Sequence, residues 1–260
     1  MKILLIFLLA FLSLSMDGQQ TFIAHRGASW LAPENTVTSA NLAWELGADA
    51  VEIDVYLTKN NKVMVIHDNS TGRTAGNVKN YTIRDTPSRV LRKLEAGSWK
   101  DEIFRGEKIP FISEILKTVP EGKKLVVEIK AGREIIPYLR QEIKKSGKLK
   151  QVVFICFNWE VILETRKVFP DNSCYWLSSS KEEWKSKKEE VAKAGLTGVN
   201  LHYKIIDEEV MQWAEKSNLE VLTWTVNDPD IAWKLTDMGV AGITTDRPGW
   251  LKKEMGKFYE

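Results

Sequence analysis

The stretch VEIDVYLTKNNKVMVIHD, residues 51–68, combines a buried-strand pattern with titratable side chains in both arms of a predicted hairpin. Side chains alternate across a strand, so Glu52 and Asp54 project from the same face. The central Asn-Asn pair favours a tight reversal, because Asn tolerates positive φ, and a two-residue turn there places Asp54 opposite His67. Two carboxylates and an imidazole brought together in this way predict a metal site, a proton-transfer site, or both.

On both sides of this hairpin, β-rich runs alternate with amphipathic helical segments. Strand followed by helix, repeated eight times over about 240 residues, predicts a closed (β/α)8 TIM barrel. A doubly wound open sheet is the alternative, although that fold requires no particular strand count. The return arm of the hairpin, residues 63–67, is expected outside the parallel barrel. The eight expected strands are residues 21–25, 50–55, 124–130, 152–157, 173–178, 198–202, 220–226 and 241–246.

Helices are expected between most of these strands, several of them opening with Asn, Ser or Asp as the N-cap. One connection is too long for a simple crossover, and we interpret residues from about 69 to 110 as an insertion within a single domain, 19–260. Such an insertion is expected to shape the barrel mouth and to select the substrate. The expected helices are residues 36–47, 87–97, 109–120, 158–169, 180–195, 207–218 and 228–239.

Bulk composition excludes some classes of protein. The chain has 260 residues, of which 43% are hydrophobic, enough for a sizeable core. Lys and Arg number 37 against 35 Asp and Glu, so the formal charge of +2 lacks the strong basic field of a nonspecific nucleic-acid binder. Nucleic acid is therefore not an expected partner.

The first 18 residues have the order of a secretory signal peptide: Lys2, an apolar run, and then small or polar residues. The apolar run is shorter than the roughly 20 residues that a helix needs to cross a bilayer. We expect export to the periplasm or the exterior, with no stable membrane span after processing; a retained anchor is the alternative.

The two cysteines, Cys156 and Cys174, fall in separate predicted strands. Free buried thiols are favoured over a disulfide. The chain has no CxxC pair and no Cys-His cluster, which excludes a structural zinc site.

Charged groups gather where the predicted strands end, at the face that carries the active site in this class of barrel. Three carboxylates facing one point would repel one another by several kcal/mol at low effective dielectric unless a cation neutralised them. Oxygen ligands without cysteine favour Ca²⁺ or Mg²⁺ as one bound divalent ion, with Mn²⁺ less favoured. The residues at these ends are His25 and Arg26, Glu52 and Asp54, and Glu128 and Lys130.

The cationic and imidazole side chains near these carboxylates suit a reaction on a phosphate. Arg26 and Lys130 supply the positive charge that a phosphate requires. His25 and His67 are candidates for general base and general acid, because an unperturbed imidazole titrates near neutral pH. A purely structural ring of salt bridges is the alternative interpretation.

Five motifs follow one another along nearly the whole chain: AHRGASWLAPENT (24–36), ELGADAVEIDVYLTKNNKVMVIHD (45–68), VEIK (127–130), WTVND (224–228) and GITTDRP (242–248). In sequence and in order, these motifs resemble those of the glycerophosphodiester phosphodiesterase family. The resemblance implies a TIM barrel that hydrolyses glycerophosphodiesters to sn-glycerol 3-phosphate and an alcohol. By the same resemblance, Glu52, Asp54 and Glu128 match divalent-metal ligands, His25 and His67 match the acid/base pair, and Arg26 and Lys130 match phosphate contacts.

Two further residues are candidates for contact with the substrate. Trp224 would stack on the glycerol carbons, with core packing as the alternative, and His202 would either approach the ligand or serve a structural role. Two other functions stay open: a metal-independent phosphoinositide-type phospholipase on the same barrel, and a non-catalytic module that binds phosphorylated headgroups. The nucleophile also stays open between the glycerol 2-hydroxyl and water.

Overall fold

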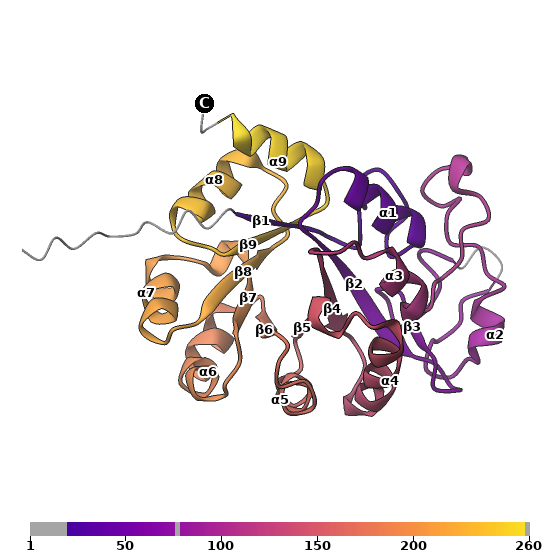
Figure 1. Ribbon diagram of the computed structural model, residues 1–260, viewed down its shortest axis with the longest axis horizontal. Helices are drawn as coiled ribbons and strands as arrows, with labels where there is room; N and C mark the ends of the chain where they lie inside the picture. Colours follow the sequence, from indigo (N-terminus) through magenta and orange to yellow (C-terminus); the bar gives the residue numbers. More distant parts are fainter. Residues whose placement is uncertain (1–19, 76–78, 258–260) are drawn as a thin grey trace, which may run out of the picture.

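Eight parallel strands close into a barrel surrounded by helices (Figure 1). The computed structural model describes residues 20–75 and 79–257, so the proposed signal peptide lies outside the described residues. Neighbouring strands pair around the sheet, and β1 pairs with both β2 and β9, which closes it. The open-sheet alternative is therefore wrong, and the predicted TIM barrel is confirmed. The barrel strands are β1 Thr21–Ala24, β2 Ala50–Leu57, β4 Lys124–Ile129, β5 Val152–Cys156, β6 Cys174–Ser178, β7 Gly198–His202, β8 Glu220–Trp224 and β9 Gly242–Thr245.

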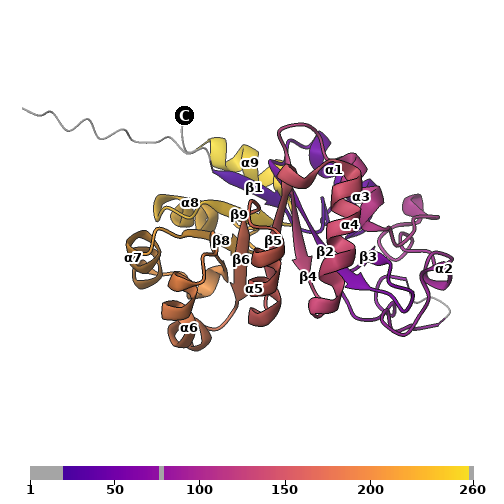
Figure 2. The same cartoon turned by 60° about the horizontal axis from the view of Figure 1, so that its bottom comes forward.

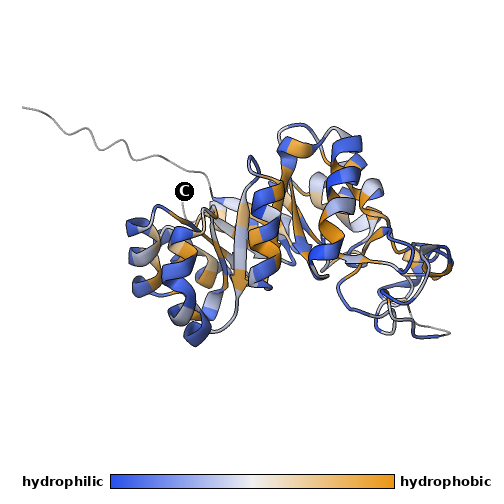
Figure 3. Ribbon diagram, turned by 90° about the horizontal axis from the view of Figure 1, so that it is seen from below, coloured by the Kyte–Doolittle hydropathy of each residue, from blue (hydrophilic) through white to orange (hydrophobic). Residues whose placement is uncertain are grey.

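The helices cover the outside of the barrel and bury their apolar faces against it. In Figure 3 much of the orange lies where helices face strands, and much of the blue lies on the outer helix surfaces. Helices α4 and α9 lie outside the segments expected to be helical, although each has a proline in its first turn, Pro137 and Pro248, which favours a helix start. The helices are α1 Val37–Glu45, α2 Ser88–Leu91, α3 Ile112–Thr118, α4 Ile136–Ser146, α5 Trp159–Val168, α6 Lys181–Lys193, α7 Glu208–Lys216, α8 Pro229–Asp237 and α9 Pro248–Gly256.

The hairpin return, β3 (Val63–Val65), pairs antiparallel with β2 and stays outside the parallel barrel, as predicted. Its predicted register is wrong by one residue, because Val55 pairs with Val65. The turn holds three residues rather than two: the Thr58 amide donates to the Lys62 carbonyl at 2.9 Å, and Asn61 has φ +58°. Asp54 consequently meets Ile66 in the ladder rather than His67, which lies beyond the end of β3.

The segment between β3 and α3 packs on one side of the barrel mouth and has a small core of its own (Figure 2). The helix expected over residues 87–97 is shorter than predicted, since α2 contains only four residues. Farther along, where the helix was expected to continue, the Glu95 carboxylate instead accepts hydrogen bonds from the amides of Gly97 and Ser98 in a turn. The small core contains Met64, Ile66, Ala75, Ile83, Leu91, Ala96 and Ile109.

Two further expectations concern cysteines and membranes. Cys156 and Cys174 are both buried and free, as favoured from sequence, and burial raises the pKa of each thiol to about 12. Across residues 20–75 and 79–257, no helix combines the length and apolarity that crossing a bilayer requires.

Candidate active site

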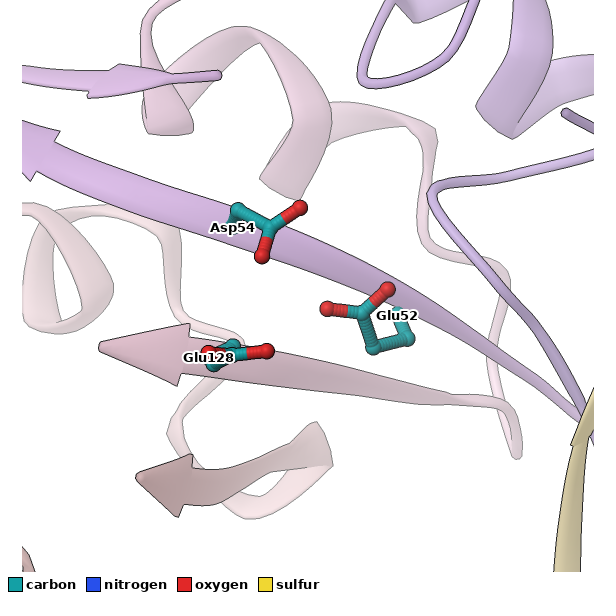
Figure 4. A group of neighbouring side chains, drawn as sticks. All are labelled: Glu52, Asp54 and Glu128. Carbon is teal, nitrogen blue, oxygen red and sulfur yellow. The ribbon is translucent and has the colours of Figure 1, made fainter. Parts of the chain in front are cut away.

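Strand register brings three carboxylates into the barrel mouth (Figure 4). Glu52 and Asp54 point inward from β2 while the intervening Ile53 packs outward into the core. Asp54 and Glu128 are direct partners in the β2–β4 ladder. Each of the three offers a carboxylate oxygen within 4.8 Å of the others, so the predicted convergence is present.

Burial makes this cluster electrostatically unusual. Glu52 and Asp54 are 2% and 1% exposed, and one oxygen of each, Glu52 Oε1 and Asp54 Oδ1, has no hydrogen-bond partner. Burial, followed by the charges of Asp54 and Glu128, holds the pKa of Glu52 well above its ordinary value. Burial and the Asp54 charge likewise raise the pKa of Glu128 to about 7. Buried carboxylate oxygens without donors are suitable ligands for a hard divalent ion, so the donor set fits a metal.

Two cations contact the cluster without neutralising all of it. Lys130 Nζ lies 2.9 Å from Glu128 Oε1 and 3.7 Å from Asp54 Oδ1. Arg26 Nε lies 3.5 Å from Asp54 Oδ2, and the backbone amide of Arg26 donates to Glu52 Oε2 at 2.9 Å. No side-chain cation among the described residues forms an ion pair with Glu52, so a simple ring of salt bridges leaves this carboxylate uncompensated.

His25 follows β1 and is tied to the far end of the chain. Its Nδ1 lies 2.6 Å from Oδ1 of Asp246, the residue after β9. Ser29 and Asn227 also donate to Asp246, at 3.1 and 2.7 Å. Burial opposes ionisation of Asp246, but the hydrogen bonds from His25 and these neighbours outweigh it and lower its pKa to about 2. An ionised Asp246 accepts the Nδ1 proton and leaves Nε2 of His25 as the nitrogen available for proton transfer.

His67 is arranged in the same way but by a sequence neighbour. Its Nδ1 lies 2.6 Å from Asp68 Oδ1, and its Nε2 lies 3.4 Å from Lys130 Nζ. Burial lowers the pKa of His67, and the charges of Arg26 and Lys130 lower it further. The charge of Asp54 and the hydrogen bond to Asp68 raise this pKa, but they do not offset the lowering. A mainly neutral imidazole near pH 7 follows from this balance.

A network of ion pairs behind the site includes residues that the sequence analysis did not select. Arg73 bridges Asp68 and Glu34 at 2.8 and 2.7 Å, and Glu34 accepts from Arg26 at 3.0 Å. Asn35, with φ +59°, donates to Asp54 Oδ2 at 2.8 Å. Glu34 and Asn35 lie in the quoted motif AHRGASWLAPENT, and Asp246 ends the last predicted strand, so the sequence carried a signal for all three. Arg73 carried none, because it lies in a turn-rich insertion.

Trp224 belongs to an aromatic group at the ends of β5, β7 and β8. Its ring meets Phe157 and His202 edge-on, with centroids 5.5 and 5.2 Å away, and its indole N–H donates to the Asn200 carbonyl. His202 Nδ1 accepts from the Lys204 amide at 3.3 Å, a local structural role. Lys130 Nζ is 6.0 Å from the Phe157 ring centroid, so this aromatic group borders the cationic side of the mouth.

Comparisons with known proteins identify the family of the chain. The sequence profile of the glycerophosphoryl diester phosphodiesterase family matches residues 25–250. The chain belongs to this family. The predicted resemblance is thereby confirmed, as is the assignment of the chain to an enzyme class.

Relatives and solved structures of the family match over most of their length. A glycerophosphodiester phosphodiesterase of Caldanaerobacter subterraneus is 32% identical over 238 residues, covering 87% of this chain and 93% of the relative. One from Bacillus subtilis is 29% identical, covering 89% and 85%. The structure of a phosphodiesterase of Oleispira antarctica in complex with the product sn-glycerol-3-phosphate has a TM-score of 0.82 at 27% identity and covers 91% and 96%.

Proposed function

We propose that this member of the family hydrolyses glycerophosphodiesters to sn-glycerol 3-phosphate and an alcohol in a metal-dependent reaction. The observation that carries the proposal is the pair of carboxylate-tethered imidazoles, His25 and His67, beside three convergent carboxylates and two cations. The product named for the Oleispira antarctica structure and the names of the relatives support the substrate class. A mature exported protein is proposed with it, on the sequence of residues 1–18.

Glu52, Asp54 and Glu128 would hold one divalent ion, Ca²⁺ or Mg²⁺ in preference to Mn²⁺. The bound ion supplies Lewis acidity toward a phosphoryl oxygen and a fixed orientation for the substrate. Arg26 and Lys130 bind the non-bridging oxygens of the phosphate and balance the charge that develops there. Trp224 offers an apolar face for the glycerol carbons.

The two imidazoles move the protons. One accepts at Nε2 the proton of the attacking hydroxyl, and the other delivers a proton from Nε2 to the departing alkoxide, so that charge does not accumulate on either oxygen. Asp246 and Asp68 keep the Nδ1 protons in place and stabilise each ring when it becomes an imidazolium. The attacking hydroxyl belongs to the substrate's glycerol 2-position or to water, and detection of a cyclic phosphate by ³¹P NMR during turnover distinguishes the two.

A coupled assay for glycerol 3-phosphate tests the reaction, the substrate and the metal together. Glycerophosphocholine, glycerophosphoethanolamine and glycerophosphoglycerol are each assayed with Mg²⁺, with Ca²⁺ and with a chelator. The proposal expects release of glycerol 3-phosphate that the chelator abolishes and either ion restores. Full activity in chelator would instead support the metal-independent phospholipase, and binding without release would support the non-catalytic module.

Metal binding has a test that does not depend on activity. A ligand that binds only the folded state raises the melting temperature by mass action, so Mg²⁺ or Ca²⁺ is expected to stabilise the wild type. Glu52→Gln removes a charge from the cluster and is expected to abolish this stabilisation. Glu160→Gln, on the exposed face of α5, serves as the matched control. Equal stabilisation of wild type and Glu52→Gln would contradict the assigned ligand set.

A further inference from the structure

One part of the barrel rim exposes apolar side chains that a monomeric enzyme would ordinarily bury. Trp30 and Leu31, in the loop between β1 and α1, are 56% and 53% exposed, and Trp250 on α9 is 38% exposed. Arg247 precedes α9 and lies between the two indoles. We refer to Trp30, Leu31, Arg247 and Trp250 as the indole rim. Contiguous exposed apolar groups of this kind mark surfaces that contact a partner or a membrane.

The arginine of the indole rim is held by stacking rather than by a carboxylate. Its guanidinium carbon lies 3.9 Å from the Trp250 ring centroid and 4.7 Å from that of Trp30. No side-chain hydrogen bond or ion pair of Arg247 occurs within the described part of the chain. Stacking occupies the faces of a guanidinium and leaves its in-plane N–H groups free, and these match the oxygens of a phosphate.

Backbone hydrogen bonds hold the indole rim to the barrel. The Trp30 amide donates to the Asp246 carbonyl at 3.1 Å, and the Leu31 amide donates to the Ala28 carbonyl at 2.9 Å. The Arg247 amide donates to Thr245 Oγ1 at 3.2 Å, and the Arg247 carbonyl accepts from the first turns of α9. The backbone therefore presents the two indoles in a defined position that has no burial function within the monomer.

Additional positive charge lies on both sides of the indole rim. Lys100, from the insertion, donates to the Ser29 carbonyl at 2.8 Å and forms no ion pair with a described carboxylate. Lys253, one turn after Trp250, is exposed and likewise has no carboxylate partner in the described ranges. The rim thus combines apolar rings with uncompensated cations, a combination that complements a surface with an apolar interior and anionic phosphate groups.

We propose that the indole rim docks the enzyme on an anionic phospholipid surface. Trp30, Leu31 and Trp250 enter the headgroup region, where indoles partition favourably, and Arg247 binds a lipid phosphate. Because Ser29 and Asp246 contact each other beside His25, the docked face is the one that carries the catalytic mouth. Docking in this orientation places the mouth against the lipid layer, which goes beyond the hydrolysis of a soluble diester.

A site-specific fluorescence experiment on the full chain tests this orientation. Leu31→Cys is labelled with a polarity-sensitive fluorophore, since the two native thiols are buried and have pKa values of about 12. Lys145→Cys, exposed on the outer face of α4, carries the same label as the matched position. Vesicles of phosphatidylcholine with and without phosphatidylglycerol, each with and without a doxyl-lipid quencher, are the probes.

The proposal expects a blue shift and doxyl quenching at position 31 with phosphatidylglycerol vesicles, and neither change at position 145. Arg247→Gln is expected to weaken association about fivefold, the effect of one cation near an anionic surface. Trp250→Ala weakens it as well, while Arg140→Gln, an exposed arginine of α4 without a described carboxylate partner, leaves it unchanged. Hydrolysis of a soluble diester by these variants verifies that each is folded.

The apolar segment at residues 3–14 can itself bind lipid, but every variant carries it, so only the difference between positions 31 and 145 reports on the indole rim. Equal responses at the two positions, or equal losses for Arg247→Gln and Arg140→Gln, would overturn the proposal. A response at position 31 to inorganic phosphate alone would also overturn it, in favour of a small-anion site.

Discussion

The two histidines of the mouth have the same local geometry and different origins. Each Nδ1 lies 2.6 Å from an aspartate oxygen. Asp246 reaches His25 from 221 residues away, across the seam where β1 meets β9, whereas Asp68 is the next residue after His67. The His25 pair therefore depends on closure of the whole barrel, and the His67 pair depends on the hairpin and on the insertion behind it. Equivalent chemistry can thus have unequal structural support.

Removal of either imidazole is the strongest test of their equivalence. His25→Ala and His67→Ala are each expected to lower kcat by about 10²- to 10⁴-fold, because each loses one proton transfer. Steady-state assays with saturating metal measure the loss, and circular dichroism verifies the fold. Near-normal turnover of either variant would show that the two imidazoles do not share the reaction.

Substitution of Asp246 and of Asp68 tests how much each aspartate contributes to orienting its histidine. Asp246→Asn is expected to lower kcat by about 10²-fold and Asp68→Asn by about 10-fold, the range found for carboxylates that orient a functional histidine. Asp246 accepts hydrogen bonds from three residues, His25, Ser29 and Asn227, so its loss releases more side chains than loss of Asp68, which pairs with His67 and Arg73 alone among the described residues. Because these are positioning residues, the pH profile of kcat should move as well. A larger loss of kcat for Asp68→Asn than for Asp246→Asn would contradict the order expected for the two histidine–aspartate pairs.

The His25–Asp246 pair should also make the free energy of unfolding depend on pH in the acidic range. The pKa of Asp246 is about 2 in the folded protein against an ordinary value of 3.8, so its ionised form stabilises the fold. That stabilisation, about 2 kcal/mol, is complete above roughly pH 4 and is lost as the pH falls toward 2. Urea unfolding of wild type and Asp246→Asn across this range measures it. The difference in unfolding free energy between the two proteins should narrow with acid; a constant difference would argue against an ionised, stabilising Asp246.

The smallest effect on kcat is expected where the insertion contacts the His67–Asp68 pair. Arg73→Gln removes the ion pairs that join Asp68 to Glu34. Because Asp68 then orients His67 less firmly, kcat should fall several-fold, which corresponds to an increase of about 1 kcal/mol in the activation free energy. Arg84→Gln is the control, since Arg84 pairs with Glu134 at 2.7 Å on an exposed part of the surface. Equal kinetics of the two variants would mean that the insertion does not support His67.

The sequence alone determined the barrel and most of the mouth, because both depend on local periodicity. Alternation within β2 puts Glu52 and Asp54 on one face whatever the rest of the chain does. The rule that strand ends meet at one face of the barrel then brings in Glu128 and Lys130. The hairpin register was mispredicted, because one extra residue in the turn, with Asn61 in the left-handed region, cannot be distinguished from a two-residue turn by composition.

Only the tertiary structure decided which distant groups meet. Asp246 joins His25 because β9 closes against β1, and Arg73 joins Glu34 because the insertion packs beside the mouth. The indole rim likewise forms from residues more than 200 positions apart, and no period in the sequence records their proximity. Local patterns specify which face a side chain takes, while closure of the sheet specifies its neighbours, since contacts at long separation depend on the packing of the whole chain.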